Sequence, residues 1–224
     1  GIDGGAATPI RVEGYTTPRG DGGAWTLRAS GSMTRVLLVD GKEWLIRNLI
    51  VDGNSAADNG VRVNDTKNYL ENVRVQDAVI AGWQLTSNAL YNRFARCAAT
   101  GCGRETVAPA SLSATDDGGF ILGGESNTFL ACVSRTNDGY GFVENGGNDH
   151  LIDCLAYGNT GAGFYEASTF SMVLIHCDAR ANGRSGLLAH GFGNFRSGLY
   201  KNNLFTANTG YGVLDNSTTH TSEE

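Results

Sequence analysis

Proline, basic residues and long apolar runs are all scarce in this sequence. Its 224 residues include 3 prolines and 17 lysines and arginines against 23 aspartates and glutamates, so the net charge is −6. Nucleic acids and anionic membranes both attract basic segments, so neither partner is expected. No apolar run approaches the ~20 residues that cross a bilayer, and residues 1–5 lack the charged and apolar regions of a signal peptide. We therefore predict no membrane span.

Glycine is abundant by contrast, with 32 residues, and it recurs with a period. A glycine precedes a large apolar residue at Val61, Trp83, Phe120, Phe142, Phe164, Leu187 and Val213, at spacings of 22, 37, 22, 22, 23 and 26 residues. A second pattern, two apolar positions and one variable residue before Asn or Cys, ends at Asn48, Asn72, Cys97, Cys132, Cys154, Cys177 and Asn202. Short strands between Gly, Asn and Asp turns at this period exclude helical solenoids, leucine-rich repeats and propellers.

Both patterns predict an all-β fold, a single-stranded right-handed parallel β-helix (a solenoid) of about eight coils. Equivalent residues of successive coils would then stack ~4.8 Å apart. We expect one domain over residues 1–224, with an irregular first coil at 1–40, an inserted loop at 103–115 and a polar tail at 216–224. Solenoids need covered ends, and no cap is evident, so we expect a segment of a longer protein or ends covered by partners.

The stacked cysteines are interpreted as small buried apolar groups, because the C-x-x-C spacing of metal sites is absent. Cys102 lies off this ladder and is the candidate for a reactive thiol. The variable residues before the ladder are expected to form an outward column of alternating charge rather than a site around His176. They are Arg47, Glu71, Arg96, Ala131, Asp153, His176 and Lys201.

A further outward lane is expected just after the glycine pattern. It contains Arg62, Gln84, Ile121, Val143, Tyr165, Leu188 and Leu214. This lane offers neither the carboxylates nor the base of a metal-dependent lyase. It suits sugar binding, with stacking on Tyr165 and contacts from Arg62 and Gln84. Its apolar strip, Ile121, Val143, Tyr165, Leu188 and Leu214, also suits contact with another copy of the chain.

Two sets of carboxylates are candidates for chemistry. Glu144 and Glu166 occupy matching positions in adjacent coils, and a separation of ~5 Å matches retaining glycosidases. Binding of Ca²⁺, or separate positions in solvent, are the alternatives. Asp116, Asp117 and Asp138 form the candidate Ca²⁺ cluster, with ordinary turn formation as the alternative, and Asp117 is a further catalytic candidate.

His190 and Arg184 project from neighbouring turns and are candidates to line the same groove, as substrate-binding residues. Ca²⁺ is the only cofactor that these residues suggest.

The segment 118–124, Gly-Gly-Phe-Ile-Leu-Gly-Gly, with Asn127-Thr-Phe-Leu-Ala-Cys and Gly139-Tyr-Gly-Phe-Val-Glu-Asn after it, resembles family 9 pectate lyases. The resemblance covers about residues 66–170 and implies a pectin-lyase-like β-helix in a carbohydrate setting. It also implies that the proton-abstracting lysine of that family is replaced by Ile121, and its Ca²⁺-binding Asp run by residues 80–84. Residues 9–23 resemble the first coil of bacterial and phage β-helix proteins, including tailspike-like ones.

We therefore expect an extracellular, cell-surface or virion module, tailspike- or adhesin-like, that binds polysaccharide or self-assembles and lacks metal-dependent lyase chemistry. The alternatives are an active polysaccharide lyase or glycoside hydrolase that uses clustered carboxylates, and a purely architectural segment.

Overall fold

The computed structural model describes residues 10–14, 24–103, 117–167, 172–189 and 199–215, and their regular elements are all β-strands. Sheet A contains β1 (Arg11–Glu13), β2 (Trp25–Arg28), β4 (Leu45–Asp52), β6 (Tyr69–Gln76), β8 (Arg93–Ala95), β9 (Ala98–Thr100), β11 (Thr128–Leu130), β12 (Val133–Arg135), β14 (His150–Ile152), β15 (Leu155–Tyr157), β17 (Val173–Ile175), β18 (Asp178–Arg180), β20 (Tyr200–Lys201) and β21 (Leu204–Thr206). Sheet B contains β3 (Met33–Val39), β5 (Ala57–Val63), β7 (Ala81–Leu85), β10 (Gly118–Leu122), β13 (Tyr140–Glu144), β16 (Phe164–Glu166), β19 (Leu187–Ala189) and β22 (Val213–Asp215).

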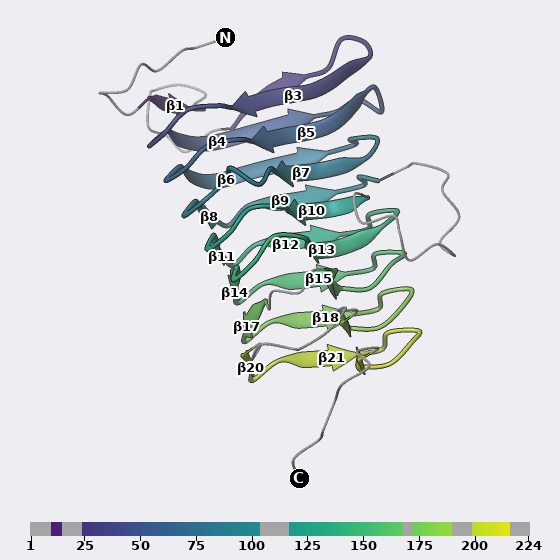
Figure 1. Ribbon diagram of the computed structural model, residues 1–224. Coiled ribbons are helices and arrows are strands. Elements are labelled where there is room, and N and C mark those ends of the chain that lie inside the picture. The colour runs from purple at the N-terminus through teal and green to yellow at the C-terminus, as the bar shows by residue number, and fades with distance from the viewer. Residues whose placement is uncertain (1–9, 15–23, 104–116, 168–171, 190–198, 216–224) are drawn as a thin grey trace.

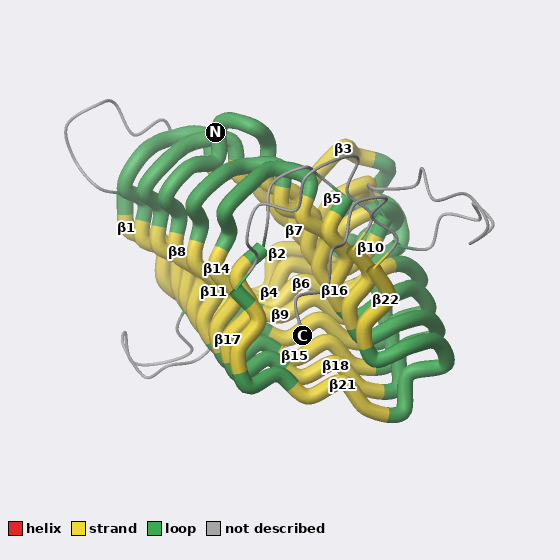
Figure 2. The backbone as a smooth tube through the Cα atoms, turned by 60° about the horizontal axis from the view of Figure 1, so that its bottom comes forward, coloured by secondary structure: helices red, strands yellow, loops and turns green. Residues whose placement is uncertain are grey.

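The coils stack along one axis, each strand pairing in parallel with its equivalents in the neighbouring coils (Figure 1). Strands lie above strands and turns above turns throughout the stack (Figure 2). Sheet B has eight strands in the order β22-β19-β16-β13-β10-β7-β5-β3, one from each coil. The predicted parallel β-helix of about eight coils is therefore confirmed. The part of the chain that the structure describes contains no helix able to cross a membrane.

The glycine-apolar pattern runs through the core of the helix in the predicted register. Trp83 pairs with Phe120, Phe120 with Phe142, and Phe142 with Phe164. These four rings are fully buried and stack with centroids 5.6, 4.7 and 5.3 Å apart. Stacked rings of this kind add to the free energy gained from burial alone.

The glycine before each ring is required by close packing. A Cβ at Gly119 would lie 2.0 Å from Ser134 Oγ, and one at Gly163 would lie 2.7 Å from the Cβ of Ala179. The glycine therefore lets sheet B approach sheet A in the coils from β5 to β19.

The second sequence pattern combined two neighbouring lanes, so part of its predicted register is wrong. Leu70 pairs with Phe94 and Leu174 with Tyr200, which shifts Asn72 and Asn202 by one residue relative to the cysteines. One lane has φ between 50° and 55° and consists of Asn48, Asn72, Arg96, Ala131, Asp153, His176 and Asn202. Asparagine tolerates this left-handed conformation, which explains why it recurs in the lane directly beside the cysteines.

The cysteine lane lies in the core, as predicted. Cys97, Cys132, Cys154 and Cys177 are free thiols and at most 1 % exposed. Cys102 is also fully buried, so its role as a reactive thiol stays a prediction that its burial does not favour.

Charged residues lie on the outside of this corner, but the predicted column is split between two lanes, because Glu71 pairs with Ala95 and Lys201 with Ile175. Glu71 pairs with Arg47 at 2.9 Å and also with Arg96, and His176 lies 3.6 Å from Asp153.

Two ladders of buried polar side chains join the coils at their turns. In the first, the N–H of each rung donates to the side-chain oxygen of the next rung, through Asn68, Asn92, Asn127 and finally Asp149. The second ladder follows the same rule through Asn137, Asn159, Asn182 and Asn208. Each ladder supplies the buried turns with the hydrogen-bond partners that their backbone groups need.

Candidate functional site

The outer face of sheet B consists of an open polar part and a closed apolar part. Its outward lane follows core residues such as Phe120 and Phe142, as predicted. In register, the lane contains Arg62, Gln84, Ile121, Val143, Tyr165, Leu188 and Leu214. Arg62 and Gln84 are partly exposed, whereas the four residues from Ile121 to Leu188 are at most 3 % exposed.

The apolar strip is therefore not the free surface that the sequence suggested. Ile121, Val143, Tyr165 and Leu188 belong to a second buried cluster, separate from the core, and Leu214 packs against it. Side-chain alternation places these residues outside the core correctly, but it does not show what covers an outer face. We consequently do not propose self-assembly through this strip.

The closed part contains a stacked pair of tyrosines, of which the sequence pattern indicated only Tyr165. The rings of Tyr140 and Tyr165 stack with centroids 4.6 Å apart, and the two residues are 7 % and 1 % exposed. Neither ring offers an open face to a sugar, so stacking on Tyr165 stays a prediction that this geometry does not favour. Tyr140 lies two residues before the core ring Phe142, so strict alternation would have placed it inside, whereas it packs with Val143 and Tyr165 on the outer side.

Arg184 and Asp117 act on these tyrosines from neighbouring coils. Burial raises the pKa of Tyr140, while Arg184 lowers this pKa and Asp117 raises it further. Burial also raises the pKa of Tyr165, with a smaller opposite effect of Arg184. The structure thus brings together three of the predicted site residues, Asp117, Tyr165 and Arg184, around a partner that was not predicted, Tyr140.

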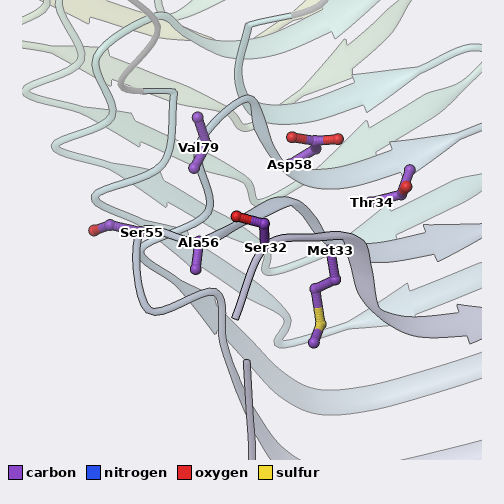
Figure 3. A pocket seen from close by; sticks show the side chains of 7 residues that line it. All are labelled: Ser32, Met33, Thr34, Ser55, Ala56, Asp58 and Val79. Carbon is purple, nitrogen blue, oxygen red and sulfur yellow. The ribbon is translucent and has the colours of Figure 1, made fainter. Parts of the chain in front are cut away.

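A pocket of about 450 Å³ lies where β3 and β5 begin and just before β7 (Figure 3). The pocket is lined by Ser32, Met33, Thr34, Ser55, Ala56, Asp58 and Val79. These residues come from three successive coils, because Met33 pairs with Ala57 in the adjacent strand and Val79 precedes β7. None of them was predicted, since isolated Ser, Thr and Asp residues in turns carry no distinctive spacing.

Arg62 and Gln84 lie on the same strands as this pocket, on β5 and β7. Gln84 is held in place by Asn59, whose Nδ2 donates to Gln84 Oε1 over 3.2 Å. Gln84 and Tyr165 are three strands apart in the lane, or roughly 14 Å at the spacing of paired strands. Gln84 is linked instead to Asn59, the residue that follows the pocket residue Asp58.

Glu144 and Glu166 pair in register, as predicted, but they face the interior. Both occupy the inner lane of sheet B, which contains the core residues Leu85 and Leu122 in earlier coils. Glu144 is fully buried and Glu166 is 2 % exposed. Glu166 Oε1 accepts hydrogen bonds from Met172 N at 2.8 Å and from the Tyr200 hydroxyl at 2.6 Å. Their catalytic role stays a prediction, and their burial separates them from any polymer on the outer face.

The candidate Ca²⁺ cluster lies partly outside the described residues, because Asp116 and His190 belong to segments that the structure does not describe. Asp117 is half-buried and Asp138 is exposed. Among the described residues no three His, Cys, Asp or Glu side chains are arranged to hold a metal ion. A Ca²⁺ site formed by Asp116, Asp117 and Asp138 therefore stays a prediction.

Two solved structures share this fold. The A-module of the mannuronan C-5 epimerase AlgE4 from Azotobacter vinelandii aligns with a TM-score of 0.62 and 16% sequence identity, over 84% of this chain and 52% of that one. ORF18 of Geobacillus virus E2 aligns with a TM-score of 0.53 and 11% identity, over 94% of this chain and 50% of that one. This chain thus spans about half the length of each.

No curated protein matches the sequence significantly. Residues 35–223 match a family described as the right handed beta helix region. This match covers most of the chain and agrees with the parallel stack of sheets A and B. The chain therefore belongs to the right-handed β-helix family.

Proposed function

We propose that this protein is a polysaccharide-binding module of an extracellular, cell-surface or virion protein, and that the ligand binds to the open part of the outer face of sheet B. The pocket where β3 and β5 begin and just before β7 is the observation that carries the proposal. Its volume of about 450 Å³ falls within the range of pockets that bind small ligands or single units of a polymer.

The pocket lining matches the chemistry of a sugar. Sugars carry hydroxyl groups, which both donate and accept hydrogen bonds, and apolar C–H faces. The hydroxyls of Ser32 and Thr34 and the carboxylate of Asp58 provide the polar partners, and Met33 and Val79 provide apolar contacts.

Arg62 and Gln84 extend this surface along the same strands. Both are partly exposed, and the carboxamide of Gln84 is oriented by Asn59. An oriented amide and a guanidinium are suited to sugar hydroxyls, and the guanidinium also pairs with a carboxylate. Because the contributing coils are ~4.8 Å apart along the axis, a polymer can contact equivalent positions on several of them.

Polysaccharide is also the first class to test because the A-module with the shared fold belongs to an enzyme that acts on mannuronan. A panel of neutral and uronate-containing polysaccharides, screened by affinity electrophoresis and then by calorimetry, tests the proposal directly. Asp58→Ala and Gln84→Ala should each weaken binding at least several-fold. Asp153→Asn, which changes an exposed carboxylate on sheet A, serves as the matched control and should leave binding unchanged.

Absence of binding to every polysaccharide in the panel, or equal binding by the pocket variants and the wild-type protein, would refute the proposal. The same panel should be examined for unsaturated uronate absorbance and for new reducing ends, with and without EDTA. Product formation that is lost in Glu144→Gln or Glu166→Gln would favour an active lyase or hydrolase instead of a binding module.

A further inference from the structure

Three carboxyl groups meet inside the β-helix where β13 and β16 end. We call Glu144, Asp149 and Glu166 the acid cluster. All three are at most 2 % exposed, and Glu144 and Glu166 occupy a lane that is apolar in the coils before them. A buried carboxylate is strongly destabilised unless it is paired with a cation or protonated.

Within the described ranges, the charged groups around Glu144 and Asp149 are acidic. No Lys, Arg or His of the described ranges forms an ion pair with Glu144 or Asp149. The charged groups that act on Glu144 are Asp149 and Glu166. The charged group that acts on Asp149 is Glu125, which forms a β-bridge with Gly147. Glu166 accepts hydrogen bonds from the Tyr200 hydroxyl and the Met172 N–H. For Glu144 and Asp149, the charged surroundings in the described part of the chain are therefore acidic.

Glu144 and Asp149 each have one carboxyl oxygen without a hydrogen-bond partner. Glu144 Oε2 and Asp149 Oδ2 are buried without a hydrogen bond, although Glu144 Oε1 accepts from Gly146 N at 3.1 Å. Asp149 Oδ1 accepts from both the N–H and the Nδ2 of Asn127, at 2.7 and 3.1 Å. An unpartnered oxygen is the position that a proton would occupy.

The first polar ladder gives an independent reason for a proton on Asp149. Asp149 is the rung after Asn68, Asn92 and Asn127, where the side chain is an amide. The amides of Asn68 and Asn127 donate through Nδ2 to the carbonyls of Asp65 and Ala89. A protonated Asp offers both an acceptor oxygen and a donor group, as these amides do, whereas an ionised Asp has no donor.

We propose that Glu144 and Asp149 hold protons in the folded protein and form a pH-sensitive lock, which secures the coil between β13 and β14 in acid and weakens progressively as the pH rises toward neutral and beyond. Burial raises the pKa of Asp149 from 3.8 to about 7, and burial together with Asp149 and Glu166 raises that of Glu144. This inference is independent of the proposed polysaccharide binding.

The direction of the pH effect follows from these pKa values. In acid Asp149 is protonated in both the folded and the unfolded chain, so it does not lower the free energy of unfolding. Between 3.8 and about 7 the unfolded chain loses the proton first, so stability falls as the pH rises. Above about 7 both states are ionised, and the full loss remains.

Thermal unfolding followed by circular dichroism from about pH 4 to about pH 8 tests the lock. The wild-type midpoint should fall across this range, and Asp149→Asn, which keeps the amide of the earlier rungs, should reduce that fall and melt higher than wild type at the alkaline end. Glu144→Gln should act in the same direction. Asp153→Asn, at an exposed carboxylate, should leave the slope unchanged.

Infrared spectroscopy of the folded wild-type protein provides a readout that needs no variant to fold. A carbonyl band of a protonated carboxylic acid should be present near neutral pH and should vanish on unfolding. A wild-type midpoint that does not fall with pH, an absent acid band, or an Asp149→Asn profile that parallels wild type would overturn the proposal. Stabilisation by Ca²⁺ that depends on Asp149 would overturn it too, because a cation would then replace the proton.

Discussion

Adding a single methyl group at Gly119 should destabilise the β-helix strongly, because sheets A and B touch there. The new Cβ would lie 2.0 Å from Ser134 Oγ and 2.8 Å from both Asn137 Nδ2 and the Gly141 carbonyl oxygen. These three groups are already bonded to one another: Ser134 Oγ donates to Gly141 O at 2.7 Å and accepts from Asn137 Nδ2 at 2.9 Å. The methyl group must therefore displace a buried network.

Overpacking a core costs about 1–3 kcal/mol, and breaking a buried hydrogen bond costs a similar amount. We expect Gly119→Ala to lose about 3 kcal/mol of unfolding free energy. For a protein of this size that loss corresponds to a fall of about 6–12 °C in the melting temperature. Gly31→Ala is the matched control, since a Cβ there meets nothing within 4 Å. It should be neutral or slightly stabilising.

A double-mutant cycle separates the clash from a general loss of flexibility. Ser134→Ala removes the closest contact of the new methyl group, so Gly119→Ala should cost less in the Ser134→Ala background than in the wild type. Calorimetric melting of the four proteins gives the coupling free energy. The reasoning is refuted if Gly119→Ala melts within the error of Gly31→Ala, or if the two substitutions are additive.

Other features lead to further expectations. Phe142→Ala, which removes the ring between Phe120 and Phe164, should lower the unfolding free energy by about 3–5 kcal/mol in urea titrations; a loss below about 1 kcal/mol would contradict its packing. Glu71→Gln, on the charged outer column, should cost less than about 1 kcal/mol, and a high-salt measurement should reduce even this cost. All five thiols should resist iodoacetamide in the native protein and react in urea, whereas rapid labelling of native Cys102 would show that it is not buried.

The fold was predictable because its strongest repeat coincides with the core. Residues such as Phe120 and Phe142 are both large and preceded by the glycine that close packing requires, so sequence spacing alone defined their register. The Asn and Cys pattern was less reliable. Asn72 is favoured by a left-handed backbone and Cys97 by burial, and two different causes in adjacent lanes resembled one repeat.

The candidate site was harder to predict because exposure depends on more than alternation. Arg62 and Gln84 were correctly expected on the outer face, but the burial of Val143 and Tyr165 on the same face has no signature in a single strand. Glu144 shows the reverse problem. Its position two residues after Phe142 predicts an inward side chain, yet a carboxylate is normally assigned to solvent.

Asp149 was not predicted as a notable residue, because only its place at the end of the Asn68, Asn92 and Asn127 ladder distinguishes it. Only the hydrogen bonds from Asn127 reveal that it occupies an asparagine position. Asn92, Asn127 and Asp149 are the residues directly before the paired strands β8, β11 and β14, so aligning these strands in the sequence would have revealed the ladder.

The asparagine ladders also give the stack a direction. The N–H of Asn137 is bonded by Asn159 of the next coil, and the N–H of Asn159 by Asn182 of the coil after that. Each backbone amide is therefore shielded by its C-terminal neighbour and not by its own coil. Hydrogen exchange at Asn159 should consequently report the opening of the coil that contains Asn182, so a series of these amides would record the order in which the solenoid unzips.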